Sequence, residues 1–415
     1  MADLHLLSPG GFRATGVFAG IKTKHAPDVG LLVCDRRASA AAAFTTNKVF
    51  AAPVKVGREH VADGRLSAIV VNAGNANACT GKPGERDARR MCALAAQVAG
   101  CEATDVLPSS TGIIGHSLPM AKVEAGILDC GNYLGNSLEH AMLFADAILT
   151  TDLKRKAAAV EFKVGREFVT VAGVCKGSGM IGPRLAVSGG GKPSGRGLKG
   201  RHATMLAYLT TDAAIASAPL RQLLGKACER SFNTVTVDDH ASTNDTAAIL
   251  ASGHSAAKFN SARAMKAFAD ALDEVCQALA YQIAADGEGA TKVVIIKVKG
   301  AATESAARTM ARAIANSPLV KCAMNGSDPN WGRIVSAAGM AGVPFNPDRC
   351  SLSLSGTTVF RNGQPVAFDA EKVSAELAKN EVVAELACRD GKSEATVWTC
   401  DLSKDYVTIN ADYHT

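Results

Sequence analysis

One low-complexity segment interrupts a chain that otherwise alternates apolar strands and helices. Residues 188–202 contain six glycines with lysines and arginines between them. Glycines and like charges leave this segment no apolar area to bury, so we expect a flexible, exposed loop. A new apolar run, Thr204–Asp212, begins directly after it. Any fold must therefore keep the loop outside the core while Thr204 enters a packed strand.

The rest of the chain predicts its elements from hydrophobic periodicity. The segments expected to form strands are Val29–Cys34, Ala68–Val71, Glu167–Cys175, Thr204–Asp212 and Val293–Val298. The segments expected to form helices are Gly84–Val98, Leu138–Ala147, Pro219–Glu229, Ser261–Ile283 and a helix capped by Thr303 that runs to Ala315. Two small-residue stretches, Asn72–Gly81 and Pro108–Gly115, are expected to be turns, the first with positive-φ positions.

This order of elements favours a mixed α/β fold with helix layers outside packed sheets. No G-x-G-x-x-G joins a strand to a helix, and the strands outnumber those of two Rossmann units. Aromatic residues make up only 5% of the chain, whereas Gly and Ala are abundant, which suits closely packed layers. A length of 415 residues indicates two to three domains or subdomains.

Charge and hydropathy argue against nucleic-acid and membrane partners. The net charge is +6, but the basic residues concentrate only in Lys192–His202, which has no aromatic residue to stack on a base. No segment reaches the roughly 18 apolar residues of a membrane span. Residues 1–13 lack the charged-then-apolar pattern of a secretory signal, so we expect a cytoplasmic protein.

The sequence matches neither a metal-binding motif nor a phosphate-loop motif. The twelve cysteines form no C-x-x-C pair, and we expect buried free thiols in a reducing compartment. Asp238–His240 is a short cluster without distant partners, so no metal is predicted. Gly191–Lys192 is followed by Pro193 where a phosphate loop needs Ser or Thr.

Thr204 is the candidate nucleophile. A threonine hydroxyl needs an adjacent base, and an N-terminal threonine supplies its own α-amine, whose pKa is about 7.7–8.0. Thr204 becomes N-terminal only if the bond after Ala203 is cut. A glycine-rich loop, a small residue and then a strand suit such a cleavage, although threonines at strand starts are common for purely structural reasons.

Eight motifs in sequential order give this hypothesis its weight. They are Val71–Gly81, Ser109–Gly115, Lys176–Pro183, Ala203–Leu206, Ser242–Thr246, Gly287–Lys292, Asp328–Ile334 and Ile409–Thr415. Together they resemble the bifunctional ornithine acetyltransferase / N-acetylglutamate synthase family, the ArgJ family, from Gly11 to Thr415. The resemblance implies a helix–sheet–sheet–helix architecture with a self-cleaving, N-terminal threonine nucleophile.

The resemblance also implies a two-chain enzyme. Residues 1–203 would form an alpha chain that ends in the basic, glycine-rich insertion of residues 187–202, and residues 204–415 a beta chain that begins with the nucleophile. Two of each would form a heterotetramer. The implied reaction moves acetyl from N2-acetylornithine to glutamate, giving ornithine and N-acetylglutamate for arginine biosynthesis. No cofactor is implied, although some members accept acetyl-CoA as a co-substrate.

The site residues follow from the same motifs. Thr204 would be the nucleophile for cleavage and for the acetyl-enzyme, and Thr111 and Gly112 would form the oxyanion hole. The substrate-binding positions implied are Lys176, Thr204, Glu288, Asn410, Thr415 and one of Thr150 and Thr151. A lysine can meet a substrate carboxylate and a glutamate a substrate amine. The sequence allows two roles for Arg333, a catalytic role or a buried structural ion pair.

Two departures from the family pattern bear on function. Arg184–His202 is a long insertion between two motifs that the family joins closely. The family's V-D-G-D-x-S-T-N-D segment reads here with Asp239 in place of Gly and His240 in place of Asp. If that position has positive φ, Asp is tolerated there better than most residues.

Two other hypotheses stay open beside the self-processing acetyltransferase. One is an uncleaved, non-catalytic relative that binds amino acids. The other is an N-terminal-nucleophile amidohydrolase or aminopeptidase with a similar architecture. The presence of Thr204, Lys176 and Glu288 favours the acetyltransferase.

Overall fold

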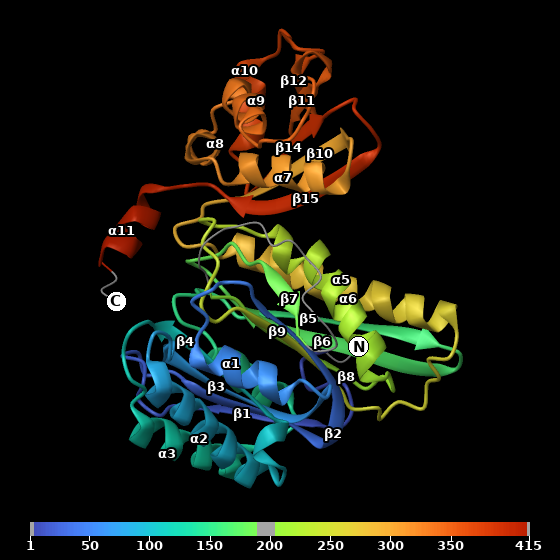
Figure 1. Ribbon diagram of the computed structural model, residues 1–415. Helices are drawn as coiled ribbons and strands as arrows, with labels where there is room; N and C mark the ends of the chain where they lie inside the picture. The colour runs from blue at the N-terminus through green and yellow to red at the C-terminus, as the bar shows by residue number, and fades with distance from the viewer. Residues whose placement is uncertain (1–3, 189–203, 413–415) are drawn as a thin grey trace. The chain divides into compact units, whose positions relative to one another are not determined.

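The computed structural model describes residues 4–188 and 204–412. The chain divides into two compact units, which are described separately here (Figure 1). The first unit runs to Asn233 and continues with His240–Leu279, and the second comprises Thr234–Asp239 and the residues from Ala280 on. Among the described residues, no helix is long and apolar enough to cross a membrane.

The first unit is built on a nine-stranded sheet. Its strands are β1 Phe12–Val17, β2 Val29–Thr45, β3 Arg65–Asn75, β4 Val106–Ile113, β5 Lys156–Val164, β6 Glu167–Lys176, β7 Leu185–Val187, β8 Leu206–Thr211 and β9 Thr246–Ala251. The order is β4-β3-β2-β9-β8-β6-β5, and β1 and β7 also pair with β2. The helices are α1 Ala52–His60, α2 Gly81–Ala99, α3 Met120–Tyr133, α4 Leu138–Ala147, α5 Ser217–Arg230 and α6 Ala262–Ala285.

Strand β2 folds this sheet into two layers. Its first half pairs with β1 and β3, and after a register shift between Val33 and Ala38 its second half pairs with β9. The exposed residues 35–37 lie at that shift. Buried side chains from both halves, such as Ile69 of β3 and Tyr208 of β8, then form one core between the layers.

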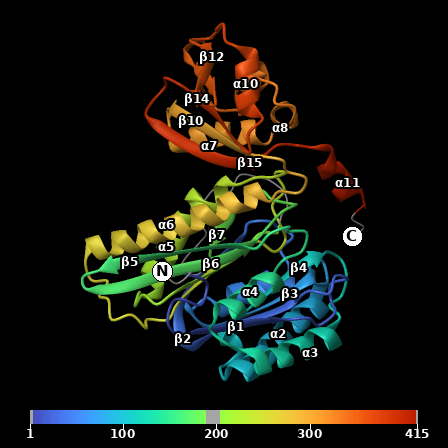
Figure 2. The same cartoon turned by 180° about the vertical axis from the view of Figure 1, so that it is seen from behind.

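Helices cover the outer faces of the two layers (Figures 1 and 2). Met91 of α2 and Ile127 of α3 share a core with Val70 of β3. On the other layer, Phe268 of α6 packs edge-on against Phe162 of β5, with ring centroids 6.3 Å apart. The expected helix–sheet–sheet–helix architecture is therefore confirmed.

The second unit is a six-stranded sheet with helices packed on it. Its strands are β10 Val293–Ala301, β11 Ser351–Leu354, β12 Thr357–Arg361, β13 Gln364–Pro365, β14 Glu381–Ala387 and β15 Ser393–Cys400, in the order β13-β12-β11-β14-β10-β15. Its helices are α7 Glu304–Ala315, α8 Pro318–Asn325, α9 Trp331–Gly339, α10 Ala370–Leu377 and α11 Lys404–Asp412. Met310 of α7, Ile334 of α9 and Val373 of α10 pack on the sheet in one core.

Most of the expected elements are present; one expected turn and the burial of three cysteines are corrected. Thr303 caps α7 as predicted, because its Oγ1 accepts a hydrogen bond from the amide of Ala306 at 3.1 Å. Pro108–Gly115 is not a turn at its start: residues up to Ile113 form β4, since β3 offers them a parallel partner. Nine cysteines are buried as expected, Cys101 is half-buried, and Cys79 and Cys322 are exposed.

The predicted cleavage point lies just before a central strand. Strand β8 is fully buried and pairs with β6 on one side and with β9 on the other. Strand β6 belongs to the predicted alpha chain, whereas β8 and β9 belong to the predicted beta chain. The two chains would therefore share one sheet, and the covalent division would not coincide with the two compact units.

This shared sheet predicts that the cleaved chains stay together. Separating them would expose the hydrogen-bonding edges of β6 and β8 and the apolar core on both faces, so fragments should co-elute in native size-exclusion chromatography. They should separate only at a denaturant concentration that also abolishes the far-ultraviolet circular dichroism signal. Dissociation of the fragments while the secondary structure remains intact would contradict the shared sheet.

Candidate active site

Thr204 lies immediately before β8, and only 8% of it is exposed. Its Oγ1 shares a hydrogen bond with Oγ of Ser242, although 38 residues separate the two in sequence. Ala203, the residue before the predicted cleavage point, lies outside the described residues. The hydroxyl that should act as nucleophile is thus buried and held by a second hydroxyl.

Parallel pairing of β8 with β9 explains this contact. Leu206 is in register with Thr246, so the residues that precede the two strands lie side by side. The amide of Thr246 donates to the carbonyl of Met205 at 2.9 Å. Residues 242–245 therefore run alongside Thr204.

Asp245 fixes the backbone around Thr204. Its carboxyl oxygens accept hydrogen bonds from the amides of Met205, at 2.5 Å, and Ser242, at 3.0 Å. Complete burial raises the pKa of this carboxyl well above its ordinary value, although the Met205 amide and the charge of Lys176 act in the opposite direction. Asp245 thus holds the residues on both sides of the Thr204–Ser242 contact.

Asn244 connects this segment to the predicted oxyanion hole. Its amide donates to Oγ of Ser242 at 2.8 Å, which makes the serine hydroxyl a better donor. Its side-chain Nδ2 donates to the carbonyls of Ala76, at 2.7 Å, and Ser110, at 2.8 Å. The residue after Ser110 is Thr111, so a single asparagine joins the neighbours of Thr204 to the residue that follows β3 and to β4.

Gly112 occupies a position that only glycine can fill. Its φ is +130°, and a Cβ atom there would lie 2.3 Å from the carbonyl carbon of Gly74. The register of β3 and β4 is irregular at this point, where Asn75 pairs with both Thr111 and Ile113. Thr111 is 1% exposed. The irregular strand backbone at Thr111–Gly112 is the kind of geometry that can aim amides at a developing oxyanion.

Lys176 ends β6, in register with Leu206 of β8. Its Nζ donates to Oγ1 of Thr150 at 2.7 Å and lies 3.7 Å from a carboxylate oxygen of Asp152. The sequence offers two threonines, Thr150 and Thr151, as candidate substrate-binding residues. In the structure the Thr150 hydroxyl contacts Lys176, and Thr151 is half-buried in the same turn. Lysine and threonine together offer a cation and a hydroxyl to a carboxylate ligand.

Asp152 is the buried counter-ion of this turn. Burial opposes its ionisation, but Lys176 and Lys156 outweigh burial and hold the pKa of the carboxyl below its ordinary value. Its Oδ1 accepts from Nζ of Lys156 and from the amide of Gly177, both at 2.7 Å. Asp152 therefore stays ionised and fixes the turn that carries Thr150.

Two of the other predicted substrate residues meet within the second unit. Nδ2 of Asn410, in α11, donates to Oε2 of Glu288 at 3.0 Å and to the carbonyl of Tyr406 at 2.9 Å. Glu288 is half-buried and Asn410 exposed. Thr415 lies outside the described residues.

The departures from the family pattern also have structural outcomes. Asp239 has a φ of +58°, a positive φ that favours Gly and that Asp adopts more readily than most residues. Its carboxylate lies 3.4 Å from Nε of Arg312. Arg333, for which two roles were open, is half-buried and donates to the carbonyl of Leu319 at 3.0 Å. The insertion lies outside the described residues from Gly189 on.

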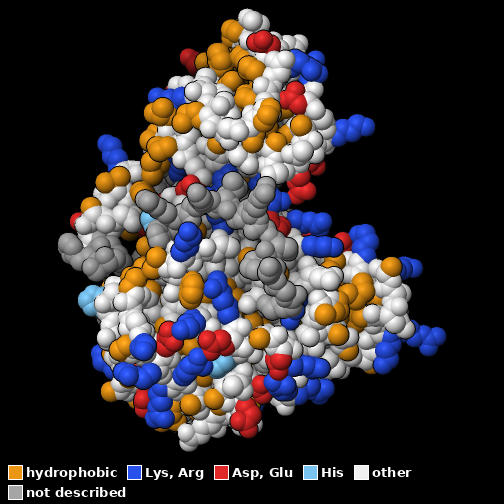
Figure 3. Space-filling view, viewed as in Figure 1, with side chains coloured by type: hydrophobic (Ala, Val, Ile, Leu, Met, Phe, Trp, Pro, Cys, Tyr) orange, Lys and Arg blue, Asp and Glu red, His pale blue; other side chains and the backbone are white. Residues whose placement is uncertain are grey.

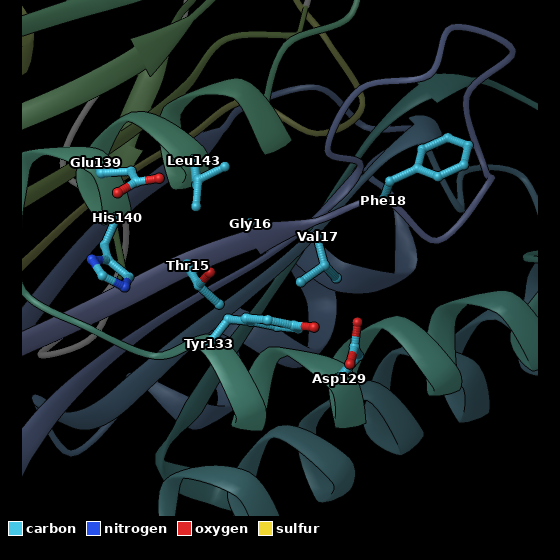
Figure 4. Close-up of a pocket in the computed structure, with 9 residues that line it drawn as sticks. All are labelled: Thr15, Gly16, Val17, Phe18, Asp129, Tyr133, Glu139, His140 and Leu143. Atoms are coloured by element: carbon cyan, nitrogen blue, oxygen red, sulfur yellow. The ribbon is translucent and has the colours of Figure 1, made fainter.

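Three further properties of the described residues bear on other kinds of site: metal ligands, pockets and surface charge. The described residues contain no group of three His, Cys, Asp or Glu side chains able to hold a metal ion. A pocket of about 360 Å³ is lined by β1, α3 and α4 but by none of the predicted site residues (Figure 4). On the face shown in Figure 3, basic and acidic side chains of the first unit are interspersed.

The sequence singled out Thr204, Thr111, Gly112 and Lys176 but assigned no role to three of their neighbours. These neighbours are Ser242, Asn244 and Asp245, which the sequence shows only as members of the Ser242–Thr246 motif. The signal that could have found them is a polar run, Ser242–Thr246, directly before the apolar residues of β9. Such a run at the start of a buried strand must find hydrogen-bond partners in the core.

Comparisons with known proteins identify the family of the chain. The ArgJ family model matches residues 13–415. The arginine biosynthesis bifunctional protein ArgJ of Rhodopirellula baltica is 43% identical over 99% of this chain and 97% of its own, and that of Symbiobacterium thermophilum is 44% identical over 98% of each. A crystal structure of an ornithine acetyltransferase complexed with ornithine, from Mycobacterium tuberculosis, is 35% identical and covers 45% of this chain and 98% of its own, with a TM-score of 0.40. The chain belongs to the ArgJ family.

Proposed function

We propose that this protein is a glutamate N-acetyltransferase of arginine biosynthesis that carries acetyl on Thr204 from N2-acetylornithine to glutamate. The observation that carries the proposal is the buried Thr204 hydroxyl, held against Ser242 at the start of a central strand, in a chain of the ArgJ family. The relatives with that family name are described as bifunctional proteins of arginine biosynthesis.

The first step is self-cleavage. Oγ1 of Thr204 attacks the carbonyl carbon of Ala203, the C–N bond to Thr204 breaks, and the Thr204 nitrogen takes the hydroxyl proton. Water then hydrolyses the resulting ester, which leaves a carboxylate on Ala203 and a free α-amine on Thr204. That amine has a pKa near neutrality and serves as the base in every later turnover.

Acetyl transfer then proceeds in two halves. The α-amine accepts the Thr204 hydroxyl proton as Oγ1 attacks the acetyl carbonyl, and ornithine leaves with that proton on its nitrogen. Glutamate's amine next attacks the acetyl-threonine ester, the bond from the acetyl carbon to Oγ1 breaks, and the Thr204 α-amine passes the proton lost by glutamate to Oγ1 as N-acetylglutamate leaves. In both halves the amides at Thr111–Gly112 are proposed to hold the oxyanion, an interaction typically worth about 2.7–4 kcal/mol for each donor.

Substrate binding is proposed to rest on charge complementarity. Both substrates carry an α-carboxylate, which suits the ammonium of Lys176 and the hydroxyl of Thr150 or Thr151. Glu288 and Asn410, together with Thr415, are proposed to bind the rest of the substrate. No cofactor is needed, and acetyl-CoA is a candidate second acetyl donor.

The assembled form is proposed to be a cytoplasmic heterotetramer of two alpha and two beta chains. Neither nucleic acid nor a membrane is a proposed partner. The competing hypotheses, an uncleaved amino-acid-binding protein and an N-terminal-nucleophile aminopeptidase, differ from the proposal in cleavage and in acyl acceptor.

Replacing Thr204 with Ala tests the proposal directly. We expect wild-type protein to run as two fragments of similar size on denaturing electrophoresis, the second starting Thr-Met-Leu-Ala. Thr204→Ala should stay uncut and inactive, because no hydroxyl is left to attack Ala203. A folded wild-type protein that remains uncut would instead support the amino-acid-binding hypothesis, and hydrolysis of amino-terminal amides without acetyl transfer would support the aminopeptidase.

The covalent intermediate predicts ping-pong kinetics. Ornithine leaves before glutamate reacts, so double-reciprocal plots for N2-acetylornithine at several glutamate concentrations should be parallel. Intersecting lines would indicate direct transfer in a ternary complex and would remove the covalent role of Thr204.

Ser242→Ala should slow both chemical steps. The serine contacts the reacting oxygen, and a hydrogen bond to a charged or developing-charge group contributes about 1.5–3 kcal/mol, so we expect cleavage and kcat to fall about ten- to hundredfold. Ser252→Ala is the matched control, because Ser252 is also buried and donates to a carbonyl, that of Gly10, at 2.6 Å. Equal effects of the two substitutions would mean that Ser242 supports the fold and not the reaction.

A further inference from the structure

The loop between β1 and β2 is held by a buried aspartate. The carboxylate of Asp28, which is 0% exposed, accepts hydrogen bonds from the amides of Ala19 and Ile21, both at 2.6 Å, and of Lys22 at 3.0 Å. Three amides on one carboxylate fix the backbone of this loop closely. The point on the loop from which the Lys22 side chain extends is thereby fixed.

The Lys22 side chain reaches the C-terminal end of α4. Its Nζ donates to the carbonyl of Leu149 at 2.9 Å and lies 3.3 Å from that of Asp146. A cation at the end of a helix satisfies carbonyls that lack partners within the helix and complements its dipole. Burial lowers the pKa of this amine, and the charges of Asp28 and Asp146 oppose that effect.

The residue after Leu149 is Thr150, whose hydroxyl meets Lys176. The path from Nζ of Lys22 to Nζ of Lys176 therefore consists of one carbonyl, one peptide link and one hydroxyl. The two ammonium groups also interact electrostatically, as does Lys22 with Asp152. A shift of Lys22 would move Thr150 relative to the lysine that is proposed to bind the substrate carboxylate.

The same loop also packs behind the predicted oxyanion hole. A Cβ atom on Gly74 would lie 3.1 Å from Cγ2 of Ile21 and 3.3 Å from Cγ of Lys22, and on its other side Gly74 touches Gly112. Ile21 and the aliphatic stem of Lys22 thus pack against Gly74, whereas the Lys22 ammonium supports Thr150. Only the second contact depends on the amine.

We propose that Lys22 is a positioning residue for substrate binding, which holds the Leu149 carbonyl and so keeps the Thr150 hydroxyl on Lys176. This inference rests on the proposed function, in which Lys176 binds the α-carboxylate of both substrates. It assigns the amine of Lys22 to substrate affinity and leaves the chemistry at Thr204 to other residues.

The chain offers a matched control on the same loop. Lys122, an exposed lysine of α3, donates from Nζ to the carbonyl of Gly20 at 2.6 Å. Lys122→Met removes an amine–carbonyl contact that orders the same loop but does not lead to Thr150. Lys22→Arg keeps a cationic donor that can reach the end of α4.

Steady-state kinetics of the cleaved, full-length protein test the proposal. Lys22→Met should raise KM for both N2-acetylornithine and glutamate about tenfold, the effect expected for loss of one charged hydrogen bond, while kcat stays within about twofold. Lys22→Arg should recover most of the loss, and Lys122→Met should match wild type. Melting temperature and the extent of cleavage, measured for every variant, report on folding.

A double-mutant cycle with Thr150→Val separates positioning from general support. If Lys22 acts through Thr150, Lys22→Met should raise KM no further in the Thr150→Val background. Full additivity, a fall in kcat with KM unchanged, or equal effects of Lys22→Met and Lys122→Met would each overturn the proposal. Should Lys22→Met fail to fold, Lys22→Gln takes its place in the cycle.

The proposal and the proposed function fail in different ways. An inactive wild-type protein, or one whose transfer does not need Thr204, defeats the proposed function whatever the Lys22 variants do. An active wild-type protein whose Lys22→Met variant has unchanged KM defeats only the positioning role.

Discussion

Parallel pairing of β8 with β9 is the constraint on which the site depends. It places the residues before the two strands next to each other, and those residues are Thr204 and Ser242–Asp245. Without this register, the Thr204 hydroxyl would have to find a partner elsewhere, because a buried hydroxyl left unpaired is costly. The environment of Thr204, the proposed nucleophile, is therefore a consequence of sheet topology, and no local sequence signal creates it.

Buried polar side chains connect these paired strands and their neighbours to loops elsewhere in the first unit. Asn244 binds carbonyls of Ala76 and Ser110, Asp245 binds the amides beside Thr204 and Ser242, and Asp28 gathers three amides of the β1–β2 loop. Each satisfies backbone groups that the ladders leave unpaired. A core rich in Ala and Gly packs the strands closely, and these few polar groups decide which loops meet at the strand ends.

The sequence predicted the elements better than their lengths. The apolar run Val29–Cys34 indicated a strand, but β2 continues to Thr45, because the charged residues 35–37 end the apolar pattern and Ala38–Ala43 carries little strand preference. The start of β4 looked like a turn because it contains Pro108, Ser109 and Gly112, and pairing with β3 overrides that local preference. Tertiary hydrogen bonds, which local sequence does not encode, decided both cases.

For the site, the family motifs allowed the candidate residues to be predicted from the sequence. They did not allow the contacts between those residues to be predicted. Thr204 and Ser242 are 38 residues apart and Lys22 and Leu149 are 127 apart, so their meeting depends on the order of strands in the sheet. The same order bears on self-cleavage. The proposed break before Thr204 would leave the ladders of β8 with β6 and β9 complete, so the sheet would keep Thr204 in place without the bond to Ala203. A strand that is hydrogen-bonded on both edges therefore suits the proposed role of Thr204, in which its amine is released while its position stays fixed.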